Sequence, residues 1–340
     1  MPNKLMYRIK GFRLTVNNVP ILTTIAIFLV MYSAASLAFP GFFSLYNYVN
    51  IFKANAYIGI IAVGMTFVII SGGIDLSVGS VVAFTTILIA KLNEAYGVPC
   101  WISMLICLVI GASLGFLVGC LISFFELPAF LVTLVAMFLM RGLAYMIHQG
   151  TISIMEDPFI IFMKKTGIKI GAGNFSLYVL VFFIVLLAGI YISKYTKFGR
   201  TVYAIGGNQN SAVLMGLPVK KTQVMIYTLS GFLSALGGIV FTIHLASGKP
   251  HNALGLELDV IAAVVIGGTL LTGGSGRVIG SFFGVLIYGL IFKLPAYISS
   301  FREWWAQILV GLMVLGFILI QTYITSNSSK LARGEAKAIE

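Results

Sequence analysis

Charged residues are scarce in this sequence: Asp, Glu, Lys and Arg together make up 9% of its 340 residues. A soluble domain carries about 25% of such residues, which bind water over its surface. This chain has too few of them to cover a globular surface, and 59% of its residues are hydrophobic. The composition excludes a soluble protein and predicts an integral membrane protein.

Acidic residues are rarer than basic ones, and the formal net charge is +12. The basic residues lie in loops between apolar spans, which is the topology signal of membrane proteins, so no nucleic acid partner is expected. Cysteine is also scarce. Cys100, Cys107 and Cys120 have no metal-type spacing and are expected to pack as small apolar side chains. We therefore expect no metal site.

A phosphate-binding loop for ATP is missing as well. The glycine-rich segment LTGGSGRVIGS lacks the G-K-[ST] ending that holds the β- and γ-phosphates. The spans contain no pair of nucleophile and base and no chain of intramembrane acids and bases. The chain is therefore not expected to be an enzyme or to hold a cofactor, and any ATP that powers it must bind to another chain.

Apolar runs of membrane-spanning length follow one another along the chain. The first covers residues 19–39 and is too long for a cleaved signal peptide, whose apolar region has about 7 to 15 residues. Because Lys4, Arg8, Lys10 and Arg13 precede it, its N-terminus is expected in the cytoplasm. The other spans are expected at 54–70, 76–92, 99–122, 128–148, 176–193, 223–247, 258–272, 276–296 and 304–322.

The number of spans has two interpretations. Some neighbouring spans are short, since 17 residues reach only about 26 Å against a hydrocarbon core of about 30 Å. Two neighbouring pairs could each form one long broken helix, which would give eight spans instead of ten. Either count is even and puts both termini on one side. We predict an all-α polytopic membrane protein, one transmembrane domain over residues 1–340, with about ten helices and both termini cytoplasmic.

Two long loops favour the ten-span arrangement. Loop 194–222 holds five basic residues and no acidic one, which is typical of a cytoplasmic loop. In loop 149–175, Glu156 and Asp157 offset the lysines, as in an external loop. Ten spans place the two loops on these opposite sides.

The stretch SGGIDLSVGS breaks a long apolar run. Gly72 and Gly73 suit the C-terminus of one helix, and Asp75 or Ser77 suits the N-cap of the next. A helix can stop at membrane depth only where protein or a water-filled cavity receives its freed backbone groups. We therefore predict a helix break near 71–76 and expect Asp75 to face protein or a cavity and not lipid.

A second stretch, TLLTGGSGRVIGS, repeats the pair of glycines and predicts another break near 272–276. Paired glycine-broken segments in the two halves of a chain point to the central pathway of a transporter. The candidates for a substrate path are Ser71, Asp75, Ser77 and Arg141. The alternative is structural: Asp75 would only cap a helix, and Arg141 would only anchor or brace its helix.

Loop 194–222 is too apolar for a plain connector. The segment NSAVLMGL predicts a short helix, with Asn210 or Ser211 as N-cap and Gly216 near the C-cap. Its Val213, Leu214 and Met215 require a partner to bury against. That partner is either the lipid surface or a chain that binds ATP.

Four motifs in order, GIIAVGMTFVIISGGIDLSVGS, LPAFLVTLVAMFLMRG, YAIGGNQNSAVLMG and AAVVIGGTLLTGGSGRVIGS, resemble the membrane-spanning permease of bacterial sugar ABC importers. The resemblance is to the family of ribose, xylose and galactose permeases and covers nearly the whole chain. Trp304 and Trp305, which open the last span, fit the permease subunits of the galactofuranose importer.

The resemblance implies a multi-pass permease of the bacterial inner membrane with about ten helices. It implies three partners: a cytoplasmic ATP-binding subunit, a periplasmic sugar-binding protein and a second permease subunit, non-identical in the galactofuranose system. Loop 194–222 would carry the helix that couples to the ATPase. The family's coupling motif falls on Gly206, Gly207, Asn208, Ala212, Met215 and Gly216.

On this basis we expect a permease that imports a monosaccharide, galactofuranose, with ATP hydrolysed by the partner. The first alternative is an ion-coupled secondary sugar transporter, which would need no ATPase. The second is a scaffold protein, which would tolerate changes at Asp75, Met215 or Gly216 without loss of uptake.

Overall fold

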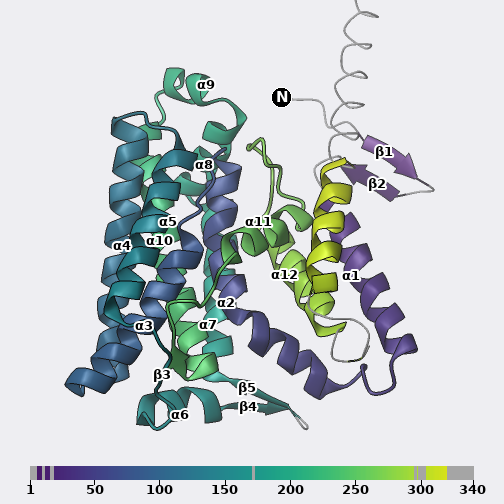
Figure 1. The fold of residues 1–340 in the computed structure, drawn as a ribbon. Helices are drawn as coiled ribbons and strands as arrows, with labels where there is room; N and C mark the ends of the chain where they lie inside the picture. Colours follow the sequence, from purple (N-terminus) through teal and green to yellow (C-terminus); the bar gives the residue numbers. More distant parts are fainter. Residues whose placement is uncertain are drawn as a thin grey trace, which may run out of the picture.

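Long helices packed side by side form the protein, as the computed structural model in Figure 1 shows. The structure describes residues 6–9, 12–15, 19–170, 173–294, 297 and 304–319. The strands in these ranges form only two-stranded pairs, β1 with β2, β3 with β6 and β4 with β5. The predicted all-α polytopic class is confirmed.

Seven helices in the described ranges are long and apolar enough to cross a membrane. Three shorter apolar helices follow them: α11, α12 and a helix over residues 304–319. The long helices are α1 (Val19–Ala38), α2 (Leu45–Ile70), α3 (Val78–Tyr96), α4 (Cys100–Phe124), α5 (Ala129–Ile147), α7 (Leu177–Tyr195) and α10 (Val219–Leu245).

The remaining elements are short. They are α6 (Pro158–Lys165), α8 (Lys197–Gly207), α9 (Gln209–Leu214), α11 (Leu256–Ile266) and α12 (Val278–Lys293), with strands β1 (Met6–Ile9), β2 (Phe12–Thr15), β3 (Ile152–Ser153), β4 (Gly167–Ile170), β5 (Gly173–Ser176) and β6 (Ser247–Gly248).

Helices α2 and α10 form the centre of the bundle, and most of each helix is buried. Helix α4 packs closely against α10 because both carry glycines at the contact. A Cβ atom at Gly115 would overlap the backbone of Tyr227, and one at Gly231 would overlap the carbonyl of Gly111. The spacing of Gly111, Gly115 and Gly119 predicts such close helix packing, and the structure confirms it.

Each predicted break is a reversal of chain direction. Gly64 of α2 lies against Ser230 of α10, and Ile61 lies against Gly237, so α2 and α10 are antiparallel. Helix α3 runs parallel to α10. Ser230 of α10 bonds to Asp75, just before α3, and Gly238, further along α10, packs on Thr85, further along α3. Helices α2 and α3 therefore run in opposite directions.

Helices α11 and α12 form a similar antiparallel pair, in which Gly267 meets Gly280 and Ala263 meets Gly284. Neither pair of helices is one long broken helix. The alternative of eight spans is wrong for both pairs, and the order of the helices follows the ten-span arrangement.

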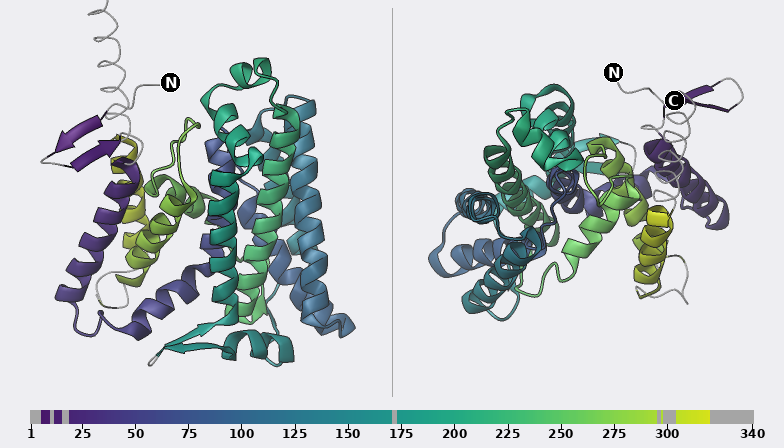
Figure 2. Two further views of the ribbon diagram at one scale, coloured as in Figure 1. Left: turned by 180° about the vertical axis from the view of Figure 1, so that it is seen from behind. Right: turned by 90° about the horizontal axis from the view of Figure 1, so that it is seen from above.

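The two ends of the bundle carry different loops. Figures 1 and 2 show α8, α9, β1 and β2 at one end and α6, β4 and β5 at the other. Loops 194–222 and 149–175 thus lie at opposite ends, as the charge pattern predicts. Lys4 and Lys10, whose charge supports a cytoplasmic N-terminus, lie outside the described residues, as does everything after residue 319.

Two predicted boundaries are wrong. The span predicted at 258–272 is only the 11-residue helix α11, which ends at Ile266 because Gly267 and Gly268 follow and Gly268 has φ +89°. At 1.5 Å per residue it reaches about 16 Å, half the hydrocarbon core. Helix α2 begins at Leu45 and not at residue 54, because the Ser44 side chain caps it by accepting from the Asn47 N–H.

Candidate functional site

The first break follows Ile70, where helix α2 ends. Gly72 has φ +85°, a left-handed conformation that glycine adopts without a clash. The Ser71 hydroxyl donates to the Val68 carbonyl at 2.7 Å and so satisfies a freed group at the helix end. The predicted sequence of stop, turn and start is confirmed here.

Asp75 is only 2% exposed and is surrounded by hydrogen-bond donors. One carboxylate oxygen accepts from the Ser77 backbone N–H at 2.9 Å and from the Ser77 hydroxyl at 2.6 Å. The other accepts from the Ser230 hydroxyl of α10 at 2.7 Å. Asp75 thus faces protein, as predicted, and ties the start of α3 to α10.

The depth of this contact follows from α10, which runs from residue 219 to residue 245. Ser230 lies near the middle of that helix, so the break is recessed into the bundle. Both carboxylate oxygens of Asp75 are occupied, which fits the structural alternative. A role of Ser71, Asp75 or Ser77 in a substrate path stays a prediction.

The second break extends from Gly267 to Arg277 and is longer than predicted. Gly268, Gly273 and Gly274 all have positive φ angles. The Leu270 N–H donates to the Ser275 carbonyl at 3.0 Å, and the Gly273 N–H donates to the Leu270 carbonyl at 3.0 Å. These bonds close the segment into a tight loop.

The two breaks contact each other directly, although they are about 200 residues apart in the chain. The Gly274 N–H donates to the Ile70 carbonyl, the last of helix α2, at 2.8 Å. Gly273 packs on Gly72. The similarity of the two glycine stretches predicts that they belong together, but not that they are hydrogen-bonded.

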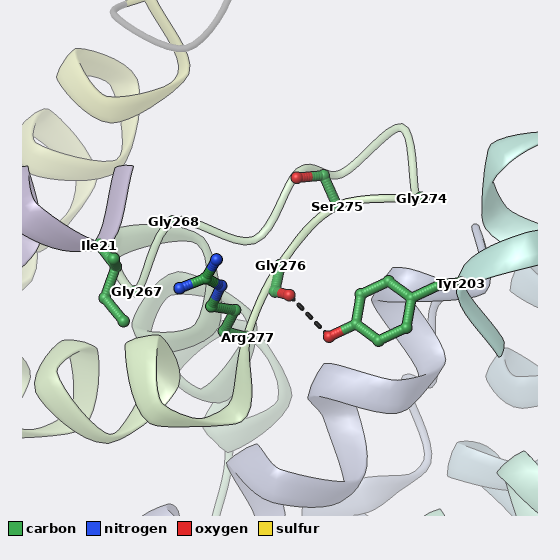
Figure 3. A pocket seen from close by; sticks show the side chains of 8 residues that line it. All are labelled: Ile21, Tyr203, Gly267, Gly268, Gly274, Ser275, Gly276 and Arg277. Carbon is green, nitrogen blue, oxygen red and sulfur yellow. Dashed lines mark hydrogen bonds between the residues drawn. The ribbon is translucent and has the colours of Figure 1, made fainter. Parts of the chain in front are cut away.

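Helix α8 lies on this junction. A Cβ atom at Gly206 would overlap both the Ile70 carbonyl and the Gly274 nitrogen. Nearer the start of α8, the Tyr203 hydroxyl donates to the Gly276 carbonyl at 2.8 Å (Figure 3). One helix of loop 194–222 therefore contacts both breaks.

A cavity of about 240 Å³ opens beside this contact. Figure 3 shows Tyr203 from α8 on one side and Arg277 from the start of α12 within the same hollow. Burial raises the pKa of the Tyr203 hydroxyl above its ordinary value, although Arg277 lowers it in part. The hydroxyl therefore stays protonated and able to donate. The lining is Ile21, Tyr203, Gly267, Gly268, Gly274, Ser275, Gly276 and Arg277.

The short helix predicted in loop 194–222 is α9, and its N-cap is Asn208. The Asn208 side-chain oxygen accepts from the Ser211 N–H at 2.8 Å. The predicted caps Asn210 and Ser211 are wrong, because both already lie inside the helix. Gly216 follows the helix end with φ +74°, as predicted for a residue near the C-cap.

Helix α9 buries one side chain and exposes the rest. Ala212 is fully buried in a small cluster with Ile205 of α8 and Val219 of α10. Leu214 is 88% exposed and Met215 is 65% exposed. The packing thus fixes α9 to α8 and α10, and its large apolar side chains point away from the protein.

Helix α8 is missing from the sequence-based prediction, which treats residues 197–207 as loop. A signal for it exists: Thr196 accepts from the Gly199 N–H at 3.1 Å as an N-cap, and Val202 and Ile205 repeat at helical spacing on the buried face. The glycines at 199, 206 and 207 conceal it, because glycine is a poor helix former.

Arg141 lies apart from the other candidates. On α5, Thr133 contacts the first break through the Ile74 carbonyl, and Arg141 is eight residues, about 12 Å, further along the helix. Its guanidinium donates to the carbonyls of Pro250, Asn252 and Ala253 at 2.8, 2.7 and 3.2 Å. These bonds favour the structural alternative, in which Arg141 holds loop 246–255.

The sequence-based prediction also misses a cavity of about 370 Å³ with several polar side chains in its lining, near the other end of the bundle. It lies between α2, α10 and α12 and combines amide, imidazole and phenol groups with two lysines. Its polar lining is Asn50, Lys53, Asn55, Tyr57, His244, Tyr288 and Lys293. The only signal for it in the sequence is the polar start of α2, which the prediction places outside the span.

Residues 47–318 match the protein family described as the permease component of branched-chain amino acid transport systems. The match covers most of the chain and contains both helix breaks and the loop with α8 and α9.

Three relatives resemble the chain over most of its length. It is 43% identical to the inner membrane ABC transporter permease protein YjfF of Escherichia coli, over 91% of this chain and 93% of the relative. It is 40% identical to the fructose import permease protein FruG of Bifidobacterium longum, over 94% and 95%. It is 36% identical to the ribose import permease protein RbsC of Haemophilus influenzae, over 87% and 91%. No solved structure matches the chain.

Proposed function

We propose that the chain, which belongs to the permease-component family just described, carries a monosaccharide, galactofuranose, into the cytoplasm as the membrane-spanning subunit of an ABC importer. Its relatives include ABC permeases for ribose and fructose, so it is a sugar ABC permease of the bacterial inner membrane. The expected family is confirmed. The chain is a transport subunit without an ATPase site of its own.

The importer has two partners that its type requires: a cytoplasmic ATP-binding subunit and a periplasmic sugar-binding protein. To these we add a second, non-identical permease subunit. The support for it is the resemblance of the motifs to the galactofuranose importer.

One observation carries the proposal: the exposed apolar side chains of α9 belong to a loop that rests on both helix breaks. Leu214 and Met215 are exposed, whereas Ala212 fixes the helix to α8 and α10. A displacement of α9 would move α8, on which it packs, and Gly206 of α8 contacts Ile70 and Gly274. An ATPase that docks on Leu214 and Met215 would thus move the ends of α2 and the loop before α12 together.

The sugar path would start at the cavity of about 370 Å³ at the end opposite α9, whose lining mixes polar and apolar side chains. Amide and hydroxyl groups bind sugar hydroxyls, and the rings of Tyr57 and Tyr288 offer apolar faces to a sugar ring. Ser71, Asp75 and Ser77 lie at the recessed break on the way to the other end. Arg141 would shape the path by holding loop 246–255.

The test is transport by the complete complex in proteoliposomes. ATP inside the vesicles should drive uptake with the binding protein present, and an ion gradient without ATP should drive none. Uptake under the gradient alone would instead support an ion-coupled transporter. Competition by galactofuranose, galactopyranose, ribose and fructose then tests the substrate: only galactofuranose should abolish uptake, and inhibition by ribose alone would contradict the assignment.

A further inference from the structure

A long groove lies between α4, α7 and α10 on the half of the bundle that carries α8 and α9. Its volume is about 950 Å³, and almost all of its lining is apolar. Ala112 and Phe116 come from α4, Ile192 from α7 and Phe232 from α10. A groove of this kind between membrane helices fits an acyl chain.

The groove continues into a second hollow of about 590 Å³ at the level of α8. Phe198, Lys221 and Met225 line both, so the two hollows adjoin at these residues. Three basic side chains, Lys197, Arg200 and Lys221, stand among the apolar residues that line the second hollow, which we call the basic hollow.

These three basic side chains have no carboxylate partner in the part of the chain that the structure describes. The neighbouring Lys220 differs, since its ammonium lies 3.5 Å from the Glu126 carboxylate. Three uncompensated positive charges around one hollow attract an anion, such as a lipid phosphate.

The depth of the basic hollow follows from the end of α7. Tyr191 and Tyr195 are exposed there, and the Lys194 ammonium lies 5.1 Å from the centre of the Tyr195 ring. Exposed tyrosines gather at the level of lipid headgroups. Lys197 follows Tyr195 by two residues, so the basic hollow lies at headgroup level and the apolar groove at the level of the acyl chains.

Because the apolar groove adjoins the basic hollow, we propose that the two together bind one anionic phospholipid of the cytoplasmic leaflet. The phosphate lies among Lys197, Arg200 and Lys221, and an acyl chain fills the groove beside Ala112 and Phe232. Only the name of the leaflet rests on the proposed function, which makes the α9 end cytoplasmic.

The bound lipid joins two helices, α8 and α10. Lys197 and Arg200 lie on α8, whereas Lys221 lies on α10. Helix α8 contacts both helix breaks through Gly206. A phospholipid in the site therefore braces α8 in the position from which it contacts the breaks.

The test measures binding of phosphatidylglycerol and phosphatidylcholine to the purified full-length chain in detergent by native mass spectrometry. Wild type should retain phosphatidylglycerol in preference to phosphatidylcholine. Lys221→Gln and Lys197→Gln should each weaken retention of phosphatidylglycerol about fivefold, the value of one basic contact at a membrane surface. Lys220→Gln is the matched control and should change nothing, because Lys220 is paired with Glu126 and does not line the site.

A second pair of variants tests the groove. Ala112→Trp should fill it and lower retention, whereas Val109→Trp, on an exposed part of the same helix, should not. Soluble glycerol phosphate should not displace phosphatidylglycerol, since it has no acyl chain.

Equal retention of the two lipids, or equal loss in Lys220→Gln and Lys221→Gln, would overturn the proposal in favour of a diffuse charge effect. A dimer that retains no lipid would assign the groove to a second copy of the chain. Each readout is lipid binding, so a failure here is separate from a failure of sugar transport.

Discussion

The N–H of Gly274 donates a hydrogen bond to the carbonyl of Ile70 at 2.8 Å. The bond joins the end of α2 to the loop before α12, so the two helix breaks form one structural unit. Helix α8 covers this unit at Gly206. The contact is so close that a side chain at position 206 would have no room. Loop 194–222 therefore has a direct packing route to both breaks through Gly206.

Gly206 should not tolerate alanine. The added methyl group would overlap the Ile70 carbonyl and the Gly274 nitrogen, and we expect overpacking to cost about 1–3 kcal/mol in the free energy of unfolding. ATP-driven uptake should fall sharply while binding of the ATPase persists. Gly207→Ala is the control, because nothing lies within 4 Å of its Cβ position. Equal uptake in the two variants would contradict the route through Gly206.

Leu214→Glu should uncouple the permease from its ATPase without unfolding it. The side chain is 88% exposed, so the free protein loses no packing. A central apolar anchor contributes about 2 kcal/mol or more to an interface, and binding of the ATPase should weaken by about thirtyfold. The measurement is the dissociation constant of the ATP-binding subunit. Leu254→Glu, an exposed leucine at the opposite end, should leave that constant unchanged.

Asp75→Ala should destabilise the junction of α3 and α10. It leaves the Ser77 N–H and the Ser230 hydroxyl without their acceptor, at a cost of about 1–3 kcal/mol. Uptake should be lost with the complex still assembled. Ser230→Ala removes one donor and keeps the carboxylate, so it separates a structural role from a role in the path.

The two roles of Asp75 predict different results for these variants. If Asp75 lines the path, uptake fails in Asp75→Ala but largely survives in Ser230→Ala, although the melting temperature falls in both. Normal uptake in Asp75→Ala would leave Asp75 with only a capping role. Ser234→Ala is the control for a buried serine of α10, since its hydroxyl bonds only within its own helix.

Gly115→Ala should destabilise the packing of α4 on α10. The methyl group would overlap the Tyr227 carbonyl, and we expect a loss of about 1–3 kcal/mol in the free energy of unfolding. Gly142→Ala should be neutral or slightly stabilising, because its Cβ position is open and alanine is the better helix former. Thermal unfolding in detergent compares the two, and equal melting temperatures would contradict the close contact.

Composition and apolar runs predicted the class of the protein, and the paired glycines predicted one break in each half of the chain. Hydrophobic runs long enough to cross a bilayer require helices, because lipid offers no partner for unpaired backbone groups. Gly72, Gly273 and Gly274 have positive φ angles, which glycine adopts freely, so these residues mark where the chain turns between helices. The short helix over residues 209–214 was also predictable, although its cap was misplaced by two to three residues.

What these segments contact follows from the packing of the helices and could not be predicted from the sequence. The hydrogen bond from Gly274 to Ile70, the position of Gly206 against both and the three carbonyls around Arg141 join residues that are far apart in the chain. Local sequence contains backbone preferences and apolar periodicity, but it does not specify which helix faces which. Packing decides that through close approach of backbones, and therefore decides that loop 194–222 and the two breaks form one unit.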